Sequence, residues 1–177
     1  MTDSISTSPL DSAADTAELR SQLRSGSEKA QLQLLQQQIA DSGWDVLMEF
    51  LLERKSEAPT AVMGKAYQIL YSANSPRAAE FLQANFPTGL VPLRSDSNID
   101  YTPLQQLLAL REFQEADRLT LDKLCELAGD TALQRKWLYF TQVESLPVAD
   151  LQTINTLWKV HSEGKFGFSV QREIWLS

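Results

Sequence analysis

The sequence predicts an all-α protein, in which an N-terminal antiparallel helical bundle is followed by a second, mostly helical domain. Apolar residues recur at spacings of three and four along most of the chain, and strand-like alternation is nowhere sustained. Residues suited to helix capping stand at the starts of these periodic segments. Only 7 glycines and 7 prolines among 177 residues leave little room for a fold rich in tight turns.

The segment from residue 15 to residue 88 is predicted to hold four or five short helices, after a disordered polar tail over residues 1–14. Ser27, Ser42 and Ser75 each stand where a helix needs an N-cap, and Pro76 suits the first helical position. The helical period predicts these inward-facing residues: Leu32, Leu35, Ile39, Val46, Leu47, Phe50, Leu51, Val62, Ala66, Ile69, Leu70, Ala79, Leu82 and Phe86. Short loops favour an antiparallel bundle. Stacked helical hairpins of the solenoid type stay open, although no sequence repeat supports them.

A break in the helical pattern separates this bundle from the second domain, residues 89–177. The stretch from Pro87 to Tyr101 holds two prolines, a glycine and a polar cluster, which predicts a loop. Further helices are predicted to start at Thr102, to run through Phe113 and end near Gly129, and to cover residues 133–143 and 148–161.

The predicted helix from Leu133 to Val143 is the main candidate for a binding surface. Its apolar residues form two stripes, with Leu133, Trp137 and Phe140 on one and Tyr139 and Val143 on the other. Such a helix either lies centrally in the core or presents one apolar face to a ligand, and the sequence leaves both readings open.

The start of this helix carries Gln134, Arg135 and Lys136. Backbone N–H groups and two cations at a helix start could meet a carboxylate, which favours the ligand reading.

No catalytic or metal-binding constellation accompanies these helices. His161, the single histidine, lacks a Cys/His/carboxylate cluster at ligand spacing, so we expect a structural or surface role for it. Cys125 lies in an apolar helix pattern and is expected to be a buried small hydrophobe. The segment from Glu163 to Phe168 lacks the spacing of a phosphate loop; its glycines should let the chain turn, pinned by Phe166 and Phe168. We therefore expect no enzyme.

The charge pattern limits the classes of partner and the cellular compartment that we expect for this protein. The formal net charge is −7, acidic residues outnumber basic ones in both halves, and no basic face is evident, so a nucleic-acid partner is not expected. No apolar run approaches the roughly 20 residues that a membrane-spanning helix needs. The acidic N-terminus fits neither a secretory signal nor a transit peptide, and one cysteine suits a reducing compartment.

Four collinear motifs carry a family resemblance. They are IDYTPLQ (residues 99–105), EADRLTLDKL (115–124), LPVADLQTINTLW (146–158) and GKFGFSVQ (164–171). Together they resemble the genomes-uncoupled tetrapyrrole-binding family, whose members are porphyrin-binding regulators of magnesium chelatase in cyanobacteria and chloroplasts. The N-terminal helices resemble, more loosely, the extra bundle of cyanobacterial members.

The resemblance implies a non-enzymatic protein of chlorophyll biosynthesis in photosynthetic organisms. Such a protein binds protoporphyrin IX or Mg-protoporphyrin IX without a covalent link and stimulates magnesium chelatase together with its large porphyrin-binding subunit. A cytoplasmic, cyanobacterial-type location is implied, with peripheral association at the thylakoid membrane left open. The implied wall and floor of the porphyrin cleft comprise Thr131, Leu133, Gln134, Arg135, Trp137 and Phe140, with Phe113 and Phe168 below them.

The resemblance also implies that the second domain is incomplete in this sequence. Family members continue past the GFSVQ motif with a tail rich in Trp, Gly and Arg, which supplies the opposite wall of the cleft. Porphyrin binding is therefore expected to be weakened, and substitution of Trp137 or Phe140 should weaken it further without unfolding the chain. A helical protein–protein adaptor that binds no porphyrin is the alternative, because exposed aromatic residues also anchor protein interfaces.

Overall fold

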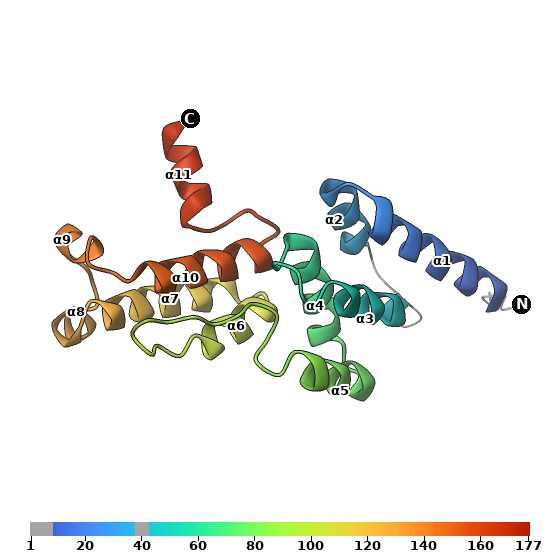
Figure 1. Ribbon diagram of the computed structural model, residues 1–177, viewed down its shortest axis with the longest axis horizontal. Helices are drawn as coiled ribbons and strands as arrows, with labels where there is room; N and C mark the ends of the chain where they lie inside the picture. Colours follow the sequence, from blue (N-terminus) through green and yellow to red (C-terminus); the bar gives the residue numbers. More distant parts are fainter. Residues whose placement is uncertain (1–8, 38–42) are drawn as a thin grey trace, which may run out of the picture. The chain divides into compact units, whose positions relative to one another are not determined.

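The computed structural model describes residues 9–37 and 43–177, and within these ranges every regular element is a helix (Figure 1). The predicted all-α class is confirmed for this part of the chain. Contacts divide the protein into two compact units, residues 1–57 and residues 58–177. Among the described helices, none has the length and apolar character required to cross a membrane.

The described residues of the first unit form three helices: α1 (Pro9–Ser25), α2 (Glu28–Gln36) and α3 (Trp44–Glu53). Because α1 begins at Pro9, residues 9–14 are helical, and the predicted tail was drawn too long. The hydroxyl of Ser27 accepts a hydrogen bond from the N–H of Ala30, which confirms the predicted N-cap of α2. Residues 1–8, Ser42 and Ile39 lie outside the described residues.

Apolar residues of all three helices form the core of the first unit. The fully buried side chains include Leu23 of α1, Leu35 of α2, and Leu47 and Leu51 of α3. Gln31, also buried, donates a hydrogen bond of 2.6 Å from its side-chain amide to the carbonyl of Leu23, so that a side chain of α2 is bonded to the backbone of α1. This unit therefore has its own core.

The second unit begins with α4 (Ala61–Ser72) and α5 (Pro76–Asn85). The hydroxyl of Ser75 accepts from the N–H of Ala78 at 3.5 Å and Pro76 is the first helical residue, as the sequence predicts. In α5, Ala78 is fully buried and Ala79 is exposed, so the predicted inward position was wrong by one residue.

In this unit α4 crosses α10 (Val148–His161) at close range, and this close approach depends on Gly64. A Cβ atom built at Gly64 would lie 2.0 Å from the carbonyl oxygen of Val160. Beside this crossing, the amide of Gln68 donates hydrogen bonds of 2.8 Å to the carbonyls of Leu108 and His161. One buried side chain thus joins α4 to the end of α10 and to the helix that contains Leu108.

A second buried polar contact lies at the same crossing. The ammonium of Lys65 lies 3.0 Å from a carboxylate oxygen of Glu163, and both side chains are about nine-tenths buried. Glu163 follows α10 with a φ of 57°, a left-handed conformation that few non-glycine residues adopt. Breaking a buried pair of this kind leaves one charge uncompensated, so the pair fixes the chain at the end of α10.

The loop between α5 and α6 (Thr102–Ala109) is held by two buried side chains. The side-chain oxygen of Gln105 accepts from the N–H of Val91, and its amide donates to the carbonyls of Thr88 and Val91. The carboxylate of Asp150, which is fully buried, accepts from the Tyr101 hydroxyl at 2.8 Å. This loop is therefore an ordered part of the fold, although it contains no helix.

The helix predicted from Leu133 to Val143 is wrong as drawn. After α7 (Phe113–Leu127) the chain forms a short α8 (Asp130–Arg135), leaves the helical path at Lys136 with a φ of 62°, and resumes in a four-residue α9 (Phe140–Val143). The hydrophobic period across this segment is interrupted by the turn, so its two predicted stripes do not exist on one helix. The last helix, α11 (Phe168–Leu176), follows the glycine-containing turn after α10.

His161 is buried at the end of α10, which confirms a structural place for the single histidine. Its exposed fraction is 1%, and neither ring nitrogen has a hydrogen-bond partner among the described residues. The ring of Tyr67 meets it edge-on, with 6.2 Å between ring centres. Burial disfavours the charged imidazolium and lowers the pKa of His161 to about 4.

This burial predicts a pH-dependent stability. The unfolded imidazole takes up a proton below about pH 6.5, whereas the folded one does so only below about pH 4. The free energy of unfolding should therefore fall as the pH drops through this window, by about 3 kcal/mol in total. Urea unfolding of the wild type and of His161→Leu at several pH values measures this change. The difference between the two proteins should lose its pH dependence above about pH 6.5; a parallel pH dependence throughout would contradict the assignment.

Candidate functional site

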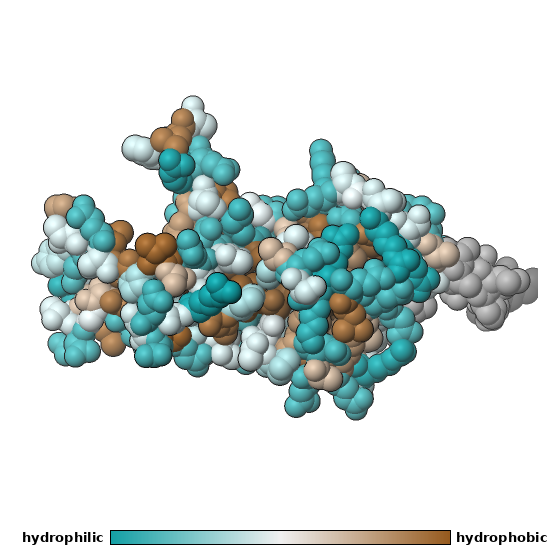
Figure 2. All heavy atoms as spheres, in the orientation of Figure 1, coloured by the Kyte–Doolittle hydropathy of each residue, from teal (hydrophilic) through white to brown (hydrophobic). Residues whose placement is uncertain are grey.

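Two neighbouring pockets lie on the face formed by α7, α10 and α11, and they share Phe168. We call them together the Phe168 cleft. The first has a volume of about 320 Å³ and is lined by Phe113, Gln114, Asp117, Thr120, Trp158, Phe166, Gly167, Phe168 and Gln171. The second has a volume of about 400 Å³ and is lined by Leu124, Leu138, Val143, Leu146, Val148, Leu151, Gln152, Asn155, Phe168, Ser169 and Arg172. Figure 2 shows hydrophobic residues gathered between α9 and the foot of α11, where the second pocket lies.

Three aromatic rings form the wall of the first pocket. Phe113 and Trp158 are stacked, with 6.2 Å between ring centres and 28° between planes. Phe166 meets both rings edge-on, at 6.0 Å and 5.9 Å. Offset and edge-on packing are the favoured arrangements of aromatic rings, so the three rings hold one another in place.

A hydrogen bond fixes the orientation of Trp158 within this wall. Its indole N–H donates to the Thr120 hydroxyl at 3.0 Å, and that hydroxyl donates in turn to the carbonyl of Ala116. The polar atom of the indole is satisfied on the α7 side, which leaves its apolar ring for the pocket.

The start of α11 is attached to α10 through Asn155. The side-chain oxygen of Asn155 accepts from the N–H and from the hydroxyl of Ser169, at 3.0 Å and 3.1 Å. Gly167, with a φ of 133°, lies so close that a Cβ atom would be 2.9 Å from the same oxygen. These contacts place Phe168 between the two pockets.

Few charged groups line the cleft. Asp117 is the charged residue on the first pocket and Arg172 the one on the second, while Gln114, Gln152 and Gln171 provide neutral donors and acceptors. The cleft is thus mainly apolar and aromatic, with polar groups from α7, α10 and α11. Such a surface suits a wide apolar ligand with a few polar substituents.

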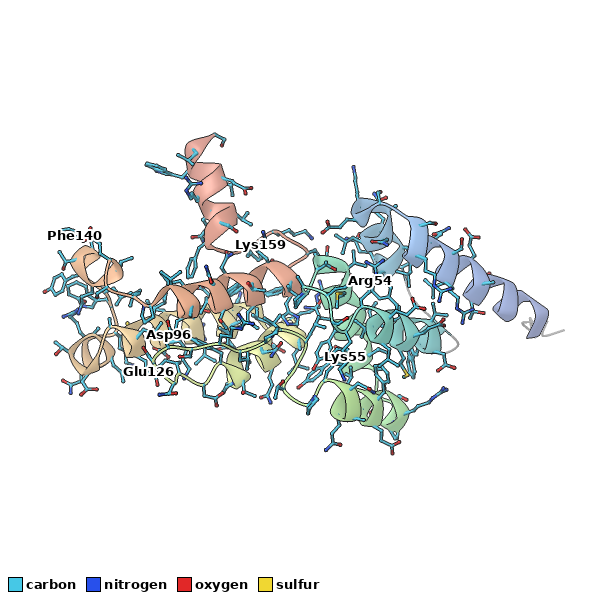
Figure 3. The ribbon with its side chains drawn as sticks, viewed as in Figure 1. Arg54, Lys55, Asp96, Glu126, Phe140 and Lys159 are labelled. Carbon is cyan, nitrogen blue, oxygen red and sulfur yellow. The ribbon has the colours of Figure 1, made fainter. Side chains whose placement is uncertain are left out.

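The structure brings together two of the eight site residues that the sequence singles out: Phe113 and Phe168 both line the first pocket. The other six lie on α8, on α9 or between them, and line neither pocket: Thr131, Leu133, Gln134, Arg135, Trp137 and Phe140. Their segment still reaches the cleft, because Leu138 and Val143 line the second pocket. Phe140 is 80% exposed and lies on α9, at one end of the second unit (Figure 3).

Arg135 is not at a helix start, as the sequence predicts, but in the last turn of α8. Its guanidinium lies 4.2 Å from the ring centres of both Trp137 and Tyr139. It also donates hydrogen bonds to the carbonyl of Trp137 and to the side chain of Gln142. We call this group the Arg135 clamp. The predicted placement of Arg135 at a helix start is therefore wrong, and its contact with a ligand carboxylate stays a prediction.

Trp158 and Phe166 also border the first pocket, although the sequence pattern gave Phe166 only a role in a turn. Trp158 is 9% exposed, and its helical spacing carries no sign that a pocket adjoins it. Phe166 and Phe168 stand two residues apart beside Gly167, and this Phe-Gly-Phe sequence was the available signal.

No described residue group suggests chemistry at the cleft. Within residues 9–37 and 43–177, no cluster of three His, Cys, Asp or Glu side chains could hold a metal ion. Cys125 is fully buried, as predicted, and burial raises the pKa of its thiol, which suppresses the thiolate. An all-helical scaffold with a preformed aromatic cleft has the form of a ligand-binding module.

Comparison with known proteins identifies the family. The GUN4-like family model matches residues 94–177, and a second model, described as an ARM-like repeat domain at the GUN4 N-terminus, matches residues 7–87. The chain belongs to the GUN4 family, which confirms the resemblance seen in its four motifs. The ARM-like description corresponds to the stacked helical hairpins that the sequence left open.

Individual relatives agree with this membership. The Ycf53-like protein of Synechocystis sp. is 47% identical over 163 residues, which cover 90% of this chain and 70% of that protein. The chloroplastic tetrapyrrole-binding protein of Arabidopsis thaliana is 41% identical over 73 residues, covering 41% of this chain and 28% of that protein. The solved structure of GUN4 from Chlamydomonas reinhardtii is 50% identical, with a TM-score of 0.47, and covers 49% of this chain and 57% of that one.

Proposed function

We propose that this protein is a non-enzymatic binder of a tetrapyrrole, and that the ligand occupies the Phe168 cleft. The observation that carries the proposal is the wall of Phe113, Trp158 and Phe166 beside an adjoining apolar pocket. The name of the Arabidopsis relative, a tetrapyrrole-binding protein, supports the same ligand class.

The chemistry of the cleft fits such a ligand. A porphyrin is a broad apolar plate with carboxylate substituents at one edge, so it needs apolar or aromatic walls and polar groups at the rim. The rings of the first pocket and the aliphatic residues of the second provide the walls, and Arg172 can meet a carboxylate at the rim of the second pocket. Protoporphyrin IX and Mg-protoporphyrin IX are the proposed ligands.

The proposed role is regulatory. A protein that binds but does not transform the porphyrin could present it to magnesium chelatase, through the large porphyrin-binding subunit, and so stimulate the chelation step of chlorophyll biosynthesis. Family membership supports this role. A cytoplasmic location with peripheral association at the thylakoid membrane belongs to the same proposal. A helical adaptor without porphyrin remains the second candidate, supported by the exposed aromatic residues around Phe140.

Titration with a soluble protoporphyrin analogue tests the proposed ligand. We expect saturable one-to-one binding, a shift of the Soret band, and quenching of tryptophan fluorescence because Trp158 lines the first pocket. Circular dichroism confirms that the chain is folded. A folded chain that shows neither the Soret shift nor quenching would favour the adaptor.

Phe166→Ala should weaken porphyrin binding about five- to tenfold, because it removes one ring of the wall, a contact worth about 1 kcal/mol. Phe166 is 48% exposed, so the variant should stay folded. Its affinity is measured by the same titration.

Phe140→Ala is the matched comparison, since Phe140 is 80% exposed and borders neither pocket. If the ligand lies in the Phe168 cleft alone, Phe140→Ala should bind like the wild type. If the cleft extends along α9, as the family resemblance implies, Phe140→Ala will also bind more weakly. Full affinity in Phe166→Ala would remove the ligand from the first pocket.

A further inference from the structure

A third pocket lies apart from the Phe168 cleft, between α4, α5 and α6, and shares no lining residue with it. We call it the tyrosine pocket. Its volume is about 400 Å³, and the residues that matter here are Tyr67, Tyr71, Ala79, Phe86 and Gln105. No Lys, Arg, His, Asp or Glu lines it. Its size is within the range of small-molecule sites, and its lining is uncharged.

The mouth of this pocket is rigid. Gln105 is 3% exposed and makes its three hydrogen bonds to the backbone of Thr88 and Val91. Gly89, with a φ of 89°, presses against it so closely that a Cβ atom would lie 2.3 Å from the Gln105 amide carbon. A ligand would therefore meet a preformed wall and would not have to order it.

Aromatic rings form the opposite side. Tyr67 and Tyr71 are stacked with 5.7 Å between ring centres, and Phe86 meets Tyr67 edge-on at 6.2 Å. Both Tyr67 and Phe86 are more than nine-tenths buried, so their rings are held by the surrounding helices. A flat aromatic ligand could continue this packing.

The hydroxyl of Tyr67 is the unexplained group. Although Tyr67 is only 4% exposed, its hydroxyl makes no hydrogen bond to any described residue. Among the described residues, only the two ring nitrogens of His161 are both inaccessible to solvent and without a hydrogen-bond partner. The Tyr67 hydroxyl also lacks a partner among these residues, so it must be accessible in part. Tyr67 is one of the residues that line the tyrosine pocket, so a ligand there would lie beside its side chain.

The chemistry of this hydroxyl selects the partner atom. Burial, followed by the neighbouring Tyr71, raises the pKa of Tyr67 to about 12, so the group stays protonated and can donate. The ring of His161, which meets the Tyr67 ring edge-on, is neutral because burial lowers its pKa to about 4, and it supplies no counter-charge. A charged ligand would lose its hydration here without compensation. The carboxylates of a tetrapyrrole are excluded on the same ground.

We propose that the tyrosine pocket binds an uncharged aromatic ring system carrying a carbonyl group, which accepts a hydrogen bond from the Tyr67 hydroxyl. The ring packs against Tyr67, Tyr71 and Phe86, and Gln105 forms the rigid edge of the site. This site is independent of the tetrapyrrole proposal, because the two pockets have no residue in common.

Acetophenone is a suitable probe, with ethylbenzene as its partner without a carbonyl. Addition of acetophenone to the 15N-labelled chain should shift amide resonances of α4, α5 and α6, with a dissociation constant on the order of 1 mM for so small a ligand. Tyr67→Phe removes only an unpartnered hydroxyl and should stay folded. It should weaken acetophenone about fivefold and leave ethylbenzene unchanged.

Ala79→Phe fills the pocket from the exposed side of α5 and should abolish binding of both probes. Glu80→Phe is the matched control, because Glu80 is also exposed on α5 but does not line the pocket, and it should bind normally. The proposal is overturned if acetophenone shifts no resonance of α4, α5 or α6. It is equally overturned if Ala79→Phe binds like the wild type, or if Tyr67→Phe weakens both probes alike.

Discussion

Gly64→Ala should destabilise the protein by about 4 kcal/mol, because one added methyl group forces two packed helices apart. The new Cβ would lie 2.0 Å from the carbonyl oxygen of Val160 and 2.8 Å from its Cγ1, and the oxygen belongs to the backbone of α10. The clash is relieved only if α4 and α10 separate, and this separation stretches the two hydrogen bonds of Gln68. The free energy of unfolding in urea measures the effect.

Gly164→Ala is the matched control for this change. Gly164 has a φ of 73°, and a Cβ atom there would meet nothing within 4 Å. The same substitution should therefore cost only about 1 kcal/mol, from the left-handed backbone alone. If Gly64→Ala costs no more than Gly164→Ala, then the closeness of the α4–α10 crossing does not contribute to stability as we infer.

Asp150→Ala should cost about 3–5 kcal/mol, because it leaves two buried or half-buried donors without an acceptor. One carboxylate oxygen accepts from the Tyr101 hydroxyl at 2.8 Å, and the other accepts from the N–H of Asp96 at 2.9 Å. Tyr101 and Asp150 are both fully buried, so solvent does not replace the hydrogen bond between them. Burial and this hydrogen bond together raise the pKa of Tyr101 well above its usual range, so its hydroxyl remains a donor.

Two further variants separate the contributions to the same loop. Thr153→Val removes a single hydrogen bond, from the Thr153 hydroxyl to the carbonyl of Arg94 at 2.7 Å, and should cost about 1 kcal/mol. Asp150→Asn keeps one acceptor oxygen, so its loss of stability should lie between those of Asp150→Ala and Thr153→Val. A loss below about 1 kcal/mol in Asp150→Ala would mean that the loop is held by other contacts.

The helix boundaries followed from sequence where caps and periodicity agreed. The range Val148–His161 was predicted to the residue, because a periodic run begins there directly after a proline. The segment after α8 failed for a physical reason. Trp137 and Phe140 stand at helical spacing, but Lys136 adopts a left-handed conformation that no glycine signals.

The site was predictable only in part. Phe113 and Phe168, which the family resemblance implied as the floor of the cleft, both line the first pocket, and their role in porphyrin binding stays a prediction. The contribution of Trp158 could not be foreseen, because a helical period indicates burial but not whether a cavity adjoins the buried ring. The tyrosine pocket depends on the close contact between Gln105 and the turn at Gly89. These two residues are separated in the sequence, and local sequence patterns do not encode such a contact.

The Arg135 clamp has a thermodynamic consequence for whatever molecule contacts this end of the second unit. Trp137 and Tyr139 are 45% and 50% exposed, yet each ring already lies against the guanidinium, and the two rings meet at 4.4 Å. Side chains that rotate freely in the unbound protein lose about 0.5–1.5 kcal/mol each when a contact immobilises them. In this protein the clamp already restricts both rings in the folded state. Binding of a partner to these rings would therefore cost less rotational entropy, and its affinity would be higher.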